Sequence, residues 1–147
     1  MATQQSSGQQ RRICLIVEDS EVDQIKMTRI VRRSPYGLTP IIAASLDAAR
    51  KALQEATPVL ILLDNNLPDG LGANFAKEVR AVPQWSRLPI VIVSDWPSPF
   101  MWEKAAAARV SYVLSKADFD GRYVRAALMG ETDPFLKPQI YSEQRRA

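Results

Sequence analysis

Short apolar runs alternate along this chain with longer segments whose apolar residues recur at helical spacing, and this alternation restricts the fold most strongly. The runs span residues 13–17, 38–44, 59–63, 89–93 and 111–115. The predicted helices span residues 20–33, 45–56, 71–82, 100–109 and 118–129. Strands that alternate with helices form parallel sheets through right-handed crossovers. The sequence therefore predicts an α/β fold, a doubly wound five-stranded parallel sheet with helices on both faces.

For two of these helices, the sequence also predicts the capping residue and the apolar residues that face the core. Asp19-Ser20 is predicted to cap the helix over 20–33, and Asp118 to cap the last helix. The apolar residues expected to face the core from the helix over 20–33 are Val22, Ile25, Met27, Ile30 and Val31. Those expected to do so from the last helix are Phe119, Tyr123, Ala127 and Leu128.

The size and composition of the chain fit one globular domain in a reducing compartment. With 147 residues and 46% hydrophobic content, the chain is long enough to bury a core. Its one cysteine, Cys14, lies within a predicted strand and favours a reducing cytoplasm over a disulfide framework. The absence of histidine excludes histidine-based triads and, with a single cysteine, the usual zinc sites. No run approaches the roughly 18 apolar residues that cross a bilayer, so we expect a cytoplasmic protein without membrane insertion.

The formal net charge of +3 has its origin at the two ends of the chain. Arg11, Arg12, Arg145 and Arg146 lie there, and without them the body is close to neutral, so we expect no direct nucleic-acid partner. Residues 1–10 are polar and predict a disordered leader. Residues 11–130 form the predicted domain. Residues 131–147 form a tail whose prolines prevent a regular helix.

Four of the predicted strands end at charged or hydroxyl-bearing residues. Glu18-Asp19 follows the first strand, Asp64 the third, Ser94 the fourth and Lys116 the fifth. In an open sheet with strand order 2-1-3-4-5, these carboxyl ends lie side by side, so the side chains converge on one pocket. Carboxylates about 4 Å apart repel each other by roughly 4 kcal/mol at an effective dielectric of about 20 and require a cation. Oxygen ligands of this kind suit Mg²⁺.

A pocket with these groups can support phosphoryl transfer onto a carboxylate. Mg²⁺, the Lys116 ammonium and the Ser94 hydroxyl would neutralise a phosphoryl group arriving on Asp64, which is a competent nucleophile. Taken one at a time, the residues have simpler roles. Glu18 and Asp19 would favour a helix N-terminus, and Asp64 would cap a turn. These separate roles do not explain why four strand ends are polar together.

The order of these residues resembles that of a known family. Glu18-Asp19, the block Asp-Asn-Asn-Leu-Pro-Asp-Gly at 64–70, then Ser94 and Lys116 are similar to the receiver domain of bacterial response regulators, the CheY-like family. The resemblance covers roughly residues 11–130 and implies a flavodoxin-like sheet of order 2-1-3-4-5.

The resemblance also implies a role for each matching residue. Asp64 would accept a phosphoryl group from a histidine kinase or a histidine phosphotransfer protein. Asp19, Asp64 and the backbone carbonyl of Asn66 would bind Mg²⁺ directly, and Glu18 would act through water. Ser94 and Lys116 would grip the phosphoryl oxygens. Movement of the loop after Ser94 would then change the surface formed by helix four, strand five and helix five, where a downstream protein target would bind.

Four residues depart from the family pattern or tune the predicted switch. Asp95 stands where a small residue is usual, and its charge should weaken phosphorylation by repulsion. The bulky Trp96 beside it is expected to cover the aspartyl phosphate and prolong its life. The switch aromatic commonly lies three residues before the lysine, where this chain has Val113, whereas Tyr112 is one position earlier. Because one residue reverses the face of a strand, either a bulge restores Tyr112 or the tyrosine relay is absent.

The most consistent interpretation is a single-domain response regulator of a two-component system or phosphorelay, a switch rather than an enzyme. The first alternative is an adaptor that keeps the fold but does not switch, which Asp95 and Val113 permit. The second is an Mg²⁺-dependent phosphatase with an aspartate nucleophile. That class usually has a second aspartate two residues after the first, where this chain has Asn66.

Overall fold

The computed structural model describes residues 11–134 and contains one five-stranded parallel sheet. Its strands are β1 (Arg12–Val17), β2 (Leu38–Ala43), β3 (Leu60–Leu63), β6 (Ile90–Ser94) and β7 (Tyr112–Ser115). Their order in space, β2-β1-β3-β6-β7, confirms the predicted flavodoxin-like order. A short antiparallel pair, β4 (Asn66–Leu67) and β5 (Gly70–Leu71), lies where the sequence predicts only a turn. The predictions for residues 1–10 and 135–147 lie outside the described part of the chain.

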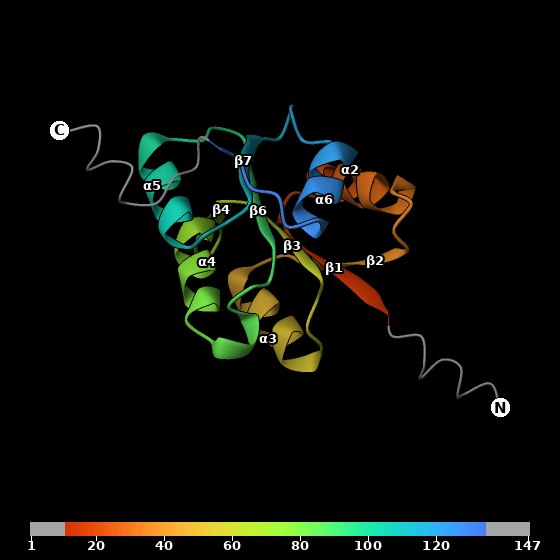
Figure 1. Cartoon of the computed structure of the whole chain (residues 1–147), viewed down its shortest axis with the longest axis horizontal. Coiled ribbons are helices and arrows are strands. Elements are labelled where there is room, and N and C mark those ends of the chain that lie inside the picture. Colours follow the sequence, from red (N-terminus) through yellow and green to blue (C-terminus); the bar gives the residue numbers. More distant parts are fainter. Residues whose placement is uncertain (1–10, 135–147) are drawn as a thin grey trace.

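Helices cover both faces of the sheet, as predicted. They are α2 (Glu21–Arg33), α3 (Leu46–Glu55), α4 (Gly72–Arg80), α5 (Pro99–Ala107) and α6 (Gly121–Leu128), with a short 3-10 helix η1 (Pro83–Trp85) after α4. Figure 1 shows α2 and α6 together on one face and α3, α4 and α5 on the other. Within residues 11–134, no helix is long and apolar enough to cross a membrane.

The core consists of two apolar layers separated by the sheet. In β3, Ile61 and Leu63 pack into the layer under α3, α4 and α5, whereas Leu60 and Leu62 pack into the layer under α2 and α6. All four side chains are fully buried. A strand that is covered on both faces has a continuous apolar run in its sequence, because the side chains on both faces are removed from water. Asp64 is therefore the first polar residue after β3, at the carboxyl end of a fully buried strand.

The helix cap predicted at Ser20 is confirmed, whereas the cap predicted for the last helix differs from the structure. The side chains of Ser20, Ser45 and Ser98 accept hydrogen bonds from the first turns of α2, α3 and α5. The prediction that Asp118 caps the last helix is wrong, because Asp120 caps α6 instead. The chain first makes a turn closed by Ser115, and this turn buries Phe119 before the helix begins.

The predicted inner face of the first helix is also partly wrong. Met27 and Val31 of α2 are buried, but Val22 is 76% and Ile25 is 59% exposed. A helix turns about 100° per residue, so Ile25 points roughly opposite to Met27. Both therefore cannot face the sheet, and the apolar pair Val22 and Ile25 lies on the outer surface of α2.

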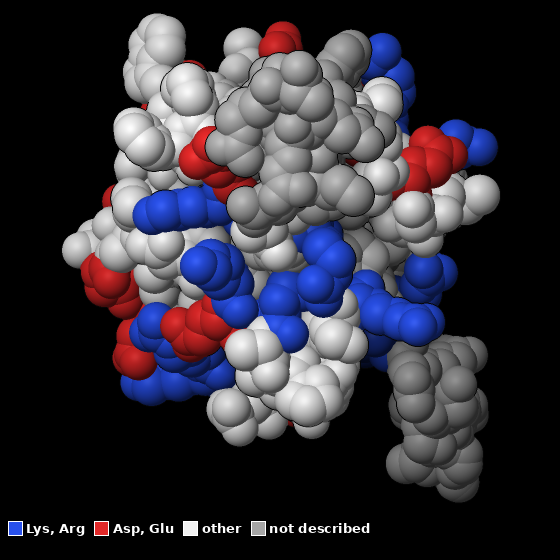
Figure 2. Space-filling model, turned by 60° about the vertical axis from the view of Figure 1, so that its left-hand side comes forward, with Lys and Arg blue, Asp and Glu red and all other residues white. Residues whose placement is uncertain are grey.

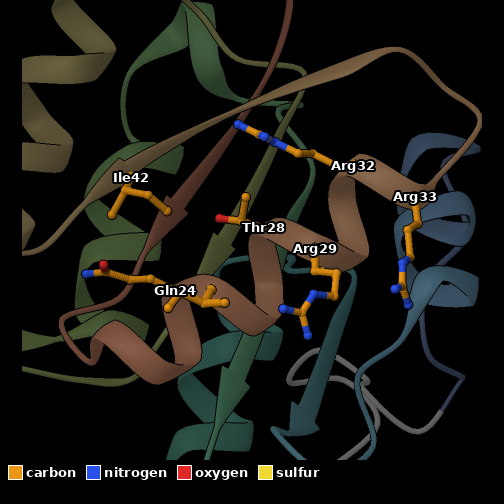
Figure 3. A pocket seen from close by; sticks show the side chains of 7 residues that line it. Gln24, Thr28, Arg29, Arg32, Arg33 and Ile42 are labelled. Carbon is orange, nitrogen blue, oxygen red and sulfur yellow. The ribbon is translucent and has the colours of Figure 1, made fainter.

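An open groove runs between this outer part of α2 and the edge strand β2. Its volume is about 500 Å³, and it is lined by Gln24, Ile25, Thr28, Arg29, Arg32, Arg33 and Ile42. Figure 3 shows Gln24, Thr28 and Arg32 extending from α2 to the side on which Ile42 of β2 lies. The groove thus combines two exposed isoleucines with three arginines.

Figure 2, which brings the α4 and α5 side forward, shows Lys and Arg side chains gathered across the lower half of this face. Charge is therefore unevenly distributed on this face, although the body expected from the sequence is close to neutral in sum. One guanidinium on this side has a structural role. Arg80 at the end of α4 donates to the backbone carbonyls of Ala108, Trp85 and Arg109 at 2.7, 2.9 and 3.3 Å. It joins α4, η1 and the loop after α5.

Candidate functional site

The polar residues predicted at the strand ends converge at one edge of the sheet. Backbone hydrogen bonds extend the ladder past the strands and fix their positions. The Asp64 N–H donates to the Val17 carbonyl at 2.9 Å, and the Lys116 N–H donates to the Ser94 carbonyl at 3.0 Å. The structure therefore brings together the side chains that the sequence places at four separate strand ends.

Three carboxylates form the centre of this site. Ligand oxygens of Glu18, Asp19 and Asp64 lie within 4.8 Å of one another. Glu18 and Asp64 are buried, whereas Asp19 is exposed and leaves the cluster open to solvent. Hard oxygen donors at this spacing, open on one side, fit a divalent cation that retains some of its water. The residues present thus suit the metal that the sequence predicts.

The buried carboxylates are shifted toward their protonated forms. Burial and the neighbouring charge of Glu18 raise the pKa of Asp64 from 3.8 to about 6, although Lys116 and the N–H groups of Asn66 and Asn65 oppose the shift. Burial likewise raises the pKa of Glu18. Two buried carboxylates repel each other when both are ionised, and the Lys116 ammonium offsets this repulsion only in part.

Lys116 supplies the positive charge of the site. Its Nζ lies 3.0 Å from Glu18, 2.7 Å from Asp23 and 3.9 Å from Asp64. Burial alone would lower its pKa, but hydrogen bonds to Asp23 and Glu18 outweigh burial and raise it. Lys116 therefore remains an ammonium ion at any physiological pH. The sequence indicated Lys116 but gave no sign of its partner Asp23.

Ser94, at the end of β6, and the loop that follows it form another part of the site. The Ser94 hydroxyl is buried and has no hydrogen-bond partner among residues 11–134. A buried hydroxyl without a partner is unfavourable, which suits a donor reserved for an incoming oxygen. Asp95 and Trp96 are exposed, Trp96 by 83%, so Trp96 does not cover Asp64 in this structure.

The strand before Lys116 contains no bulge. Tyr112 pairs with Val91 and Val113 with Ile92 in regular parallel register. Val113 is buried in the layer under α5, whereas Tyr112 lies on the other face, edge-on to Tyr123 of α6 at 5.2 Å between ring centroids. Of the two alternatives left by the sequence, this register favours the absence of the tyrosine relay.

The block 64–72 holds the phosphoacceptor candidate in place. The Asn65 side chain accepts from the N–H of Ala73 at 2.9 Å, and Asp69 accepts from the first two N–H groups of α3. Asn66 is exposed, so its side chain is available to solvent. A Cβ atom at Gly72 would overlap the Asp64 carbonyl, hence only glycine fits there. The sequence alone did not indicate this role for Gly72, although a glycine eight residues after Asp64, at the start of α4, was a usable signal.

The fold and site define a receiver-type signalling domain, and comparison with known proteins agrees. A family model, the response regulator receiver domain, matches residues 14–128. The chain belongs to this family, whose members act in two-component systems as switches controlled by phosphorylation.

Individual relatives are similar over part of their length. Response regulator Rcp1 of Synechocystis is 31% identical over 90 residues, which cover 56% of this chain and 61% of Rcp1. The KDP operon transcriptional regulatory protein KdpE of Escherichia coli is 35% identical over 82 residues, covering 54% of this chain and 33% of KdpE. The matched segment is thus less than two thirds of either relative.

Two solved structures have the same fold. The Mn²⁺-bound form of response regulator Rcp1 superposes with a TM-score of 0.67 and 25% identity, covering 80% of this chain and 90% of that one. The phosphorylated cyanobacterial phytochrome response regulator RcpA superposes with a TM-score of 0.68 and 20% identity, covering 82% of this chain and 91% of that one.

Proposed function

We propose that this chain is a signalling switch that accepts a phosphoryl group on Asp64 and acts by binding another protein. The observation that carries the proposal is the environment of Asp64. Its carboxylate lies in a metal-compatible cluster with Glu18 and Asp19, 3.9 Å from the Lys116 ammonium, and the neighbouring strand ends at the buried Ser94 hydroxyl, which has no hydrogen-bond partner within residues 11–134. The switch unit would extend over residues 11–130.

In the proposed reaction, an Asp64 carboxylate oxygen attacks the phosphorus of a phosphohistidine. A P–O bond forms while the P–N bond breaks, and the electron pair of that bond returns to the imidazole nitrogen. With a pKa of about 6, Asp64 is mostly ionised at neutral pH and competent to attack. Lys116 and Ser94 stabilise the oxygens of the transferred group.

A divalent cation completes the proposed site. Mg²⁺ held by Glu18, Asp19 and Asp64, with the Asn66 carbonyl as a further ligand, would neutralise charge on the carboxylates and the phosphoryl oxygens. The Mn²⁺-bound form of Rcp1 supports the binding of a divalent metal, and the phosphorylated form of RcpA supports the modification.

The proposed donor is a histidine kinase or a histidine phosphotransfer protein that docks beside Asp64. Helix α2 begins next to the site and exposes Val22 and Ile25, and exposed apolar clusters mark contact surfaces. Replacing Ile25 with Asp should reduce transfer from a phosphohistidine donor about tenfold and leave phosphorylation by acetyl phosphate unchanged. Equal losses with both donors would place Ile25 in the fold rather than the interface.

The proposed output is a change at the surface formed by α5, β7 and α6. Once the phosphoryl group engages the Ser94 hydroxyl, the adjoining loop with Asp95 and Trp96 would shift. Trp96 and Phe100 are 83% and 77% exposed, so they can report or bind a protein target.

Intact mass after incubation with acetyl phosphate and Mg²⁺ tests the proposal directly. Wild type should gain one phosphoryl group, and the Asp64→Asn variant should gain none. If neither a small donor nor a cognate kinase modifies wild type, the non-switching adaptor becomes the better explanation. Catalytic turnover of an aryl phosphate would instead indicate a phosphatase, although Asn66 lies where that class usually has an aspartate.

A further inference from the structure

The carboxylate nearest to the Lys116 ammonium belongs to a residue outside the metal-compatible cluster. Nζ lies 2.7 Å from Asp23, 3.0 Å from Glu18, 3.8 Å from Asp95 and 3.9 Å from Asp64. The contact with Asp23 is a hydrogen bond between side chains 93 residues apart. Asp64, the proposed acceptor, is therefore not the group to which Lys116 is bound in the unmodified protein.

We propose that Asp23 competes with the phosphoryl group for Lys116 and thereby weakens phosphoryl binding at Asp64. This inference rests on the proposed function and adds a tuning residue to it. Asp23 acts through Lys116 and is a positioning residue, because it lies outside the cluster that could hold the metal.

The geometry of α2 makes this competition specific. Asp23 lies in the first turn of α2, where its own N–H donates to the Ser20 cap. One turn later, the Lys26 ammonium donates to the backbone carbonyl of Lys116 at 2.9 Å. Helix α2 thus contacts both the side chain and the backbone of Lys116. If the Lys116 ammonium moved toward a phosphoryl group, its hydrogen bond with Asp23 would lengthen or break.

The charges explain why the contact should weaken phosphoryl binding. A lysine ammonium has three donors; Asp23 accepts a hydrogen bond from one at 2.7 Å, and Glu18 forms an ion pair with the same ammonium at 3.0 Å. The side chains of Lys116 and Asp23 are only 11% and 24% exposed, so water screens their attraction little. A phosphoryl group on Asp64 must share this ammonium with Asp23 and also meets the negative charge of Asp23.

Beryllofluoride binding at saturating Mg²⁺, measured by calorimetry, tests the inference without a kinase. We expect Asp23→Asn to bind this phosphoryl mimic about tenfold more tightly than wild type, and Asp23→Glu to behave like wild type. Asp95→Asn is the matched control, because it removes an acid 3.8 Å from the same ammonium that is 63% exposed. Its effect should be less than threefold.

Two further readouts separate competition from a loosened fold. Mg²⁺ affinity should fall or stay constant in Asp23→Asn, because a nearby negative charge is lost, while beryllofluoride affinity rises. A disturbed site would instead lower the affinity for both Mg²⁺ and beryllofluoride. The Lys116 ammonium protons, observed by NMR, should exchange faster in Asp23→Asn than in wild type or Asp23→Glu.

The outcomes distinguish this inference from the proposed function. If wild type binds beryllofluoride and Asp23→Asn binds it equally or more weakly, the role of Asp23 is overturned and the switch stands. If wild type binds no beryllofluoride at saturating Mg²⁺, both the proposed function and the role of Asp23 are overturned.

Discussion

Two parts of the site around Asp64 differ in how firmly their groups are held before any ligand arrives. In one part, Lys116 is paired with Glu18 and Asp23 at 3.0 and 2.7 Å. In the other part, the buried Ser94 hydroxyl has no partner within residues 11–134, and Trp96 after it is 83% exposed. The cationic part is thus built in advance, while the hydroxyl part is completed only by an incoming oxygen.

Removing Lys116, which is already paired before a ligand binds, should have the largest effect on stability. Lys116→Ala leaves Glu18 and Asp64 buried without their cation, so we expect a loss of about 3–5 kcal/mol in the free energy of unfolding, measured with urea. Lys51→Ala is the control, because its ion pair with Asp47 is exposed and should contribute less than about 1 kcal/mol. Similar losses in the two variants would contradict the comparison.

Asp64→Asn should stabilise the metal-free protein, and the gain should depend on pH. Because the folded pKa of Asp64, about 6, exceeds 3.8, the stability contributed by its protonated form is complete below pH 3.8 and is lost as pH rises through 6. The gain from Asp64→Asn should therefore be absent below about pH 4 and reach at most about 3 kcal/mol above pH 7.

The control for this experiment is Mg²⁺ itself. The cation binds the Asp64 carboxylate in wild type only, so saturating Mg²⁺ should shrink or reverse the gain. A pH-independent gain would mean that packing, not the buried charge, distinguishes the two proteins.

In the hydroxyl part of the site, Ser94→Ala should separate stability from function. Deleting a buried hydroxyl without a partner removes an unfavourable group, so stability should be unchanged or rise by up to about 1 kcal/mol. Beryllofluoride affinity should fall about tenfold. The matched control is Ser34→Ala, which removes a hydroxyl that donates to the Val31 carbonyl at 2.7 Å and should lower stability. Loss of stability in both variants would show that Ser94 is already satisfied.

The smallest expected effect concerns Trp96. If its ring closes over the aspartyl phosphate, Trp96→Ala should accelerate phosphate loss by about two- to threefold, measured after removal of the donor. Phe100→Ala is the control, because Phe100 is a second exposed aromatic residue four positions later in the chain. Equal rates in Trp96→Ala and wild type would end the idea that the ring protects the phosphate.

The sequence predicted the sheet and the set of residues at its edge because both depend on local patterns. Buried strands such as Leu60–Leu63 are continuous apolar runs, and the polar residue that ends each run necessarily lies at the sheet edge. The predicted strand order is confirmed, and the carboxylates of Glu18 and Asp64 meet as expected.

Contacts between distant elements were not predictable in this way. Asp23 lies on an acidic first turn of α2, where helix-dipole effects already explain an acid, so nothing in the sequence indicated its contact with Lys116. The inner face of α2 was misassigned because Val22 and Ile25 are apolar yet exposed. Composition does not distinguish an apolar surface from an apolar core.

The guanidinium of Arg80 has a mechanical consequence. By binding the carbonyls of Ala108 and Arg109, it anchors the C-terminal end of α5 to α4 and η1, whereas the N-terminal end follows the exposed residues 95 and 96. Helix α5 is therefore held by side-chain hydrogen bonds at its C-terminal end, while in its first turn Met101 is buried and Phe100 is 77% exposed. If the loop after Ser94 is displaced, we expect the first turn of α5 to move more than its last turn.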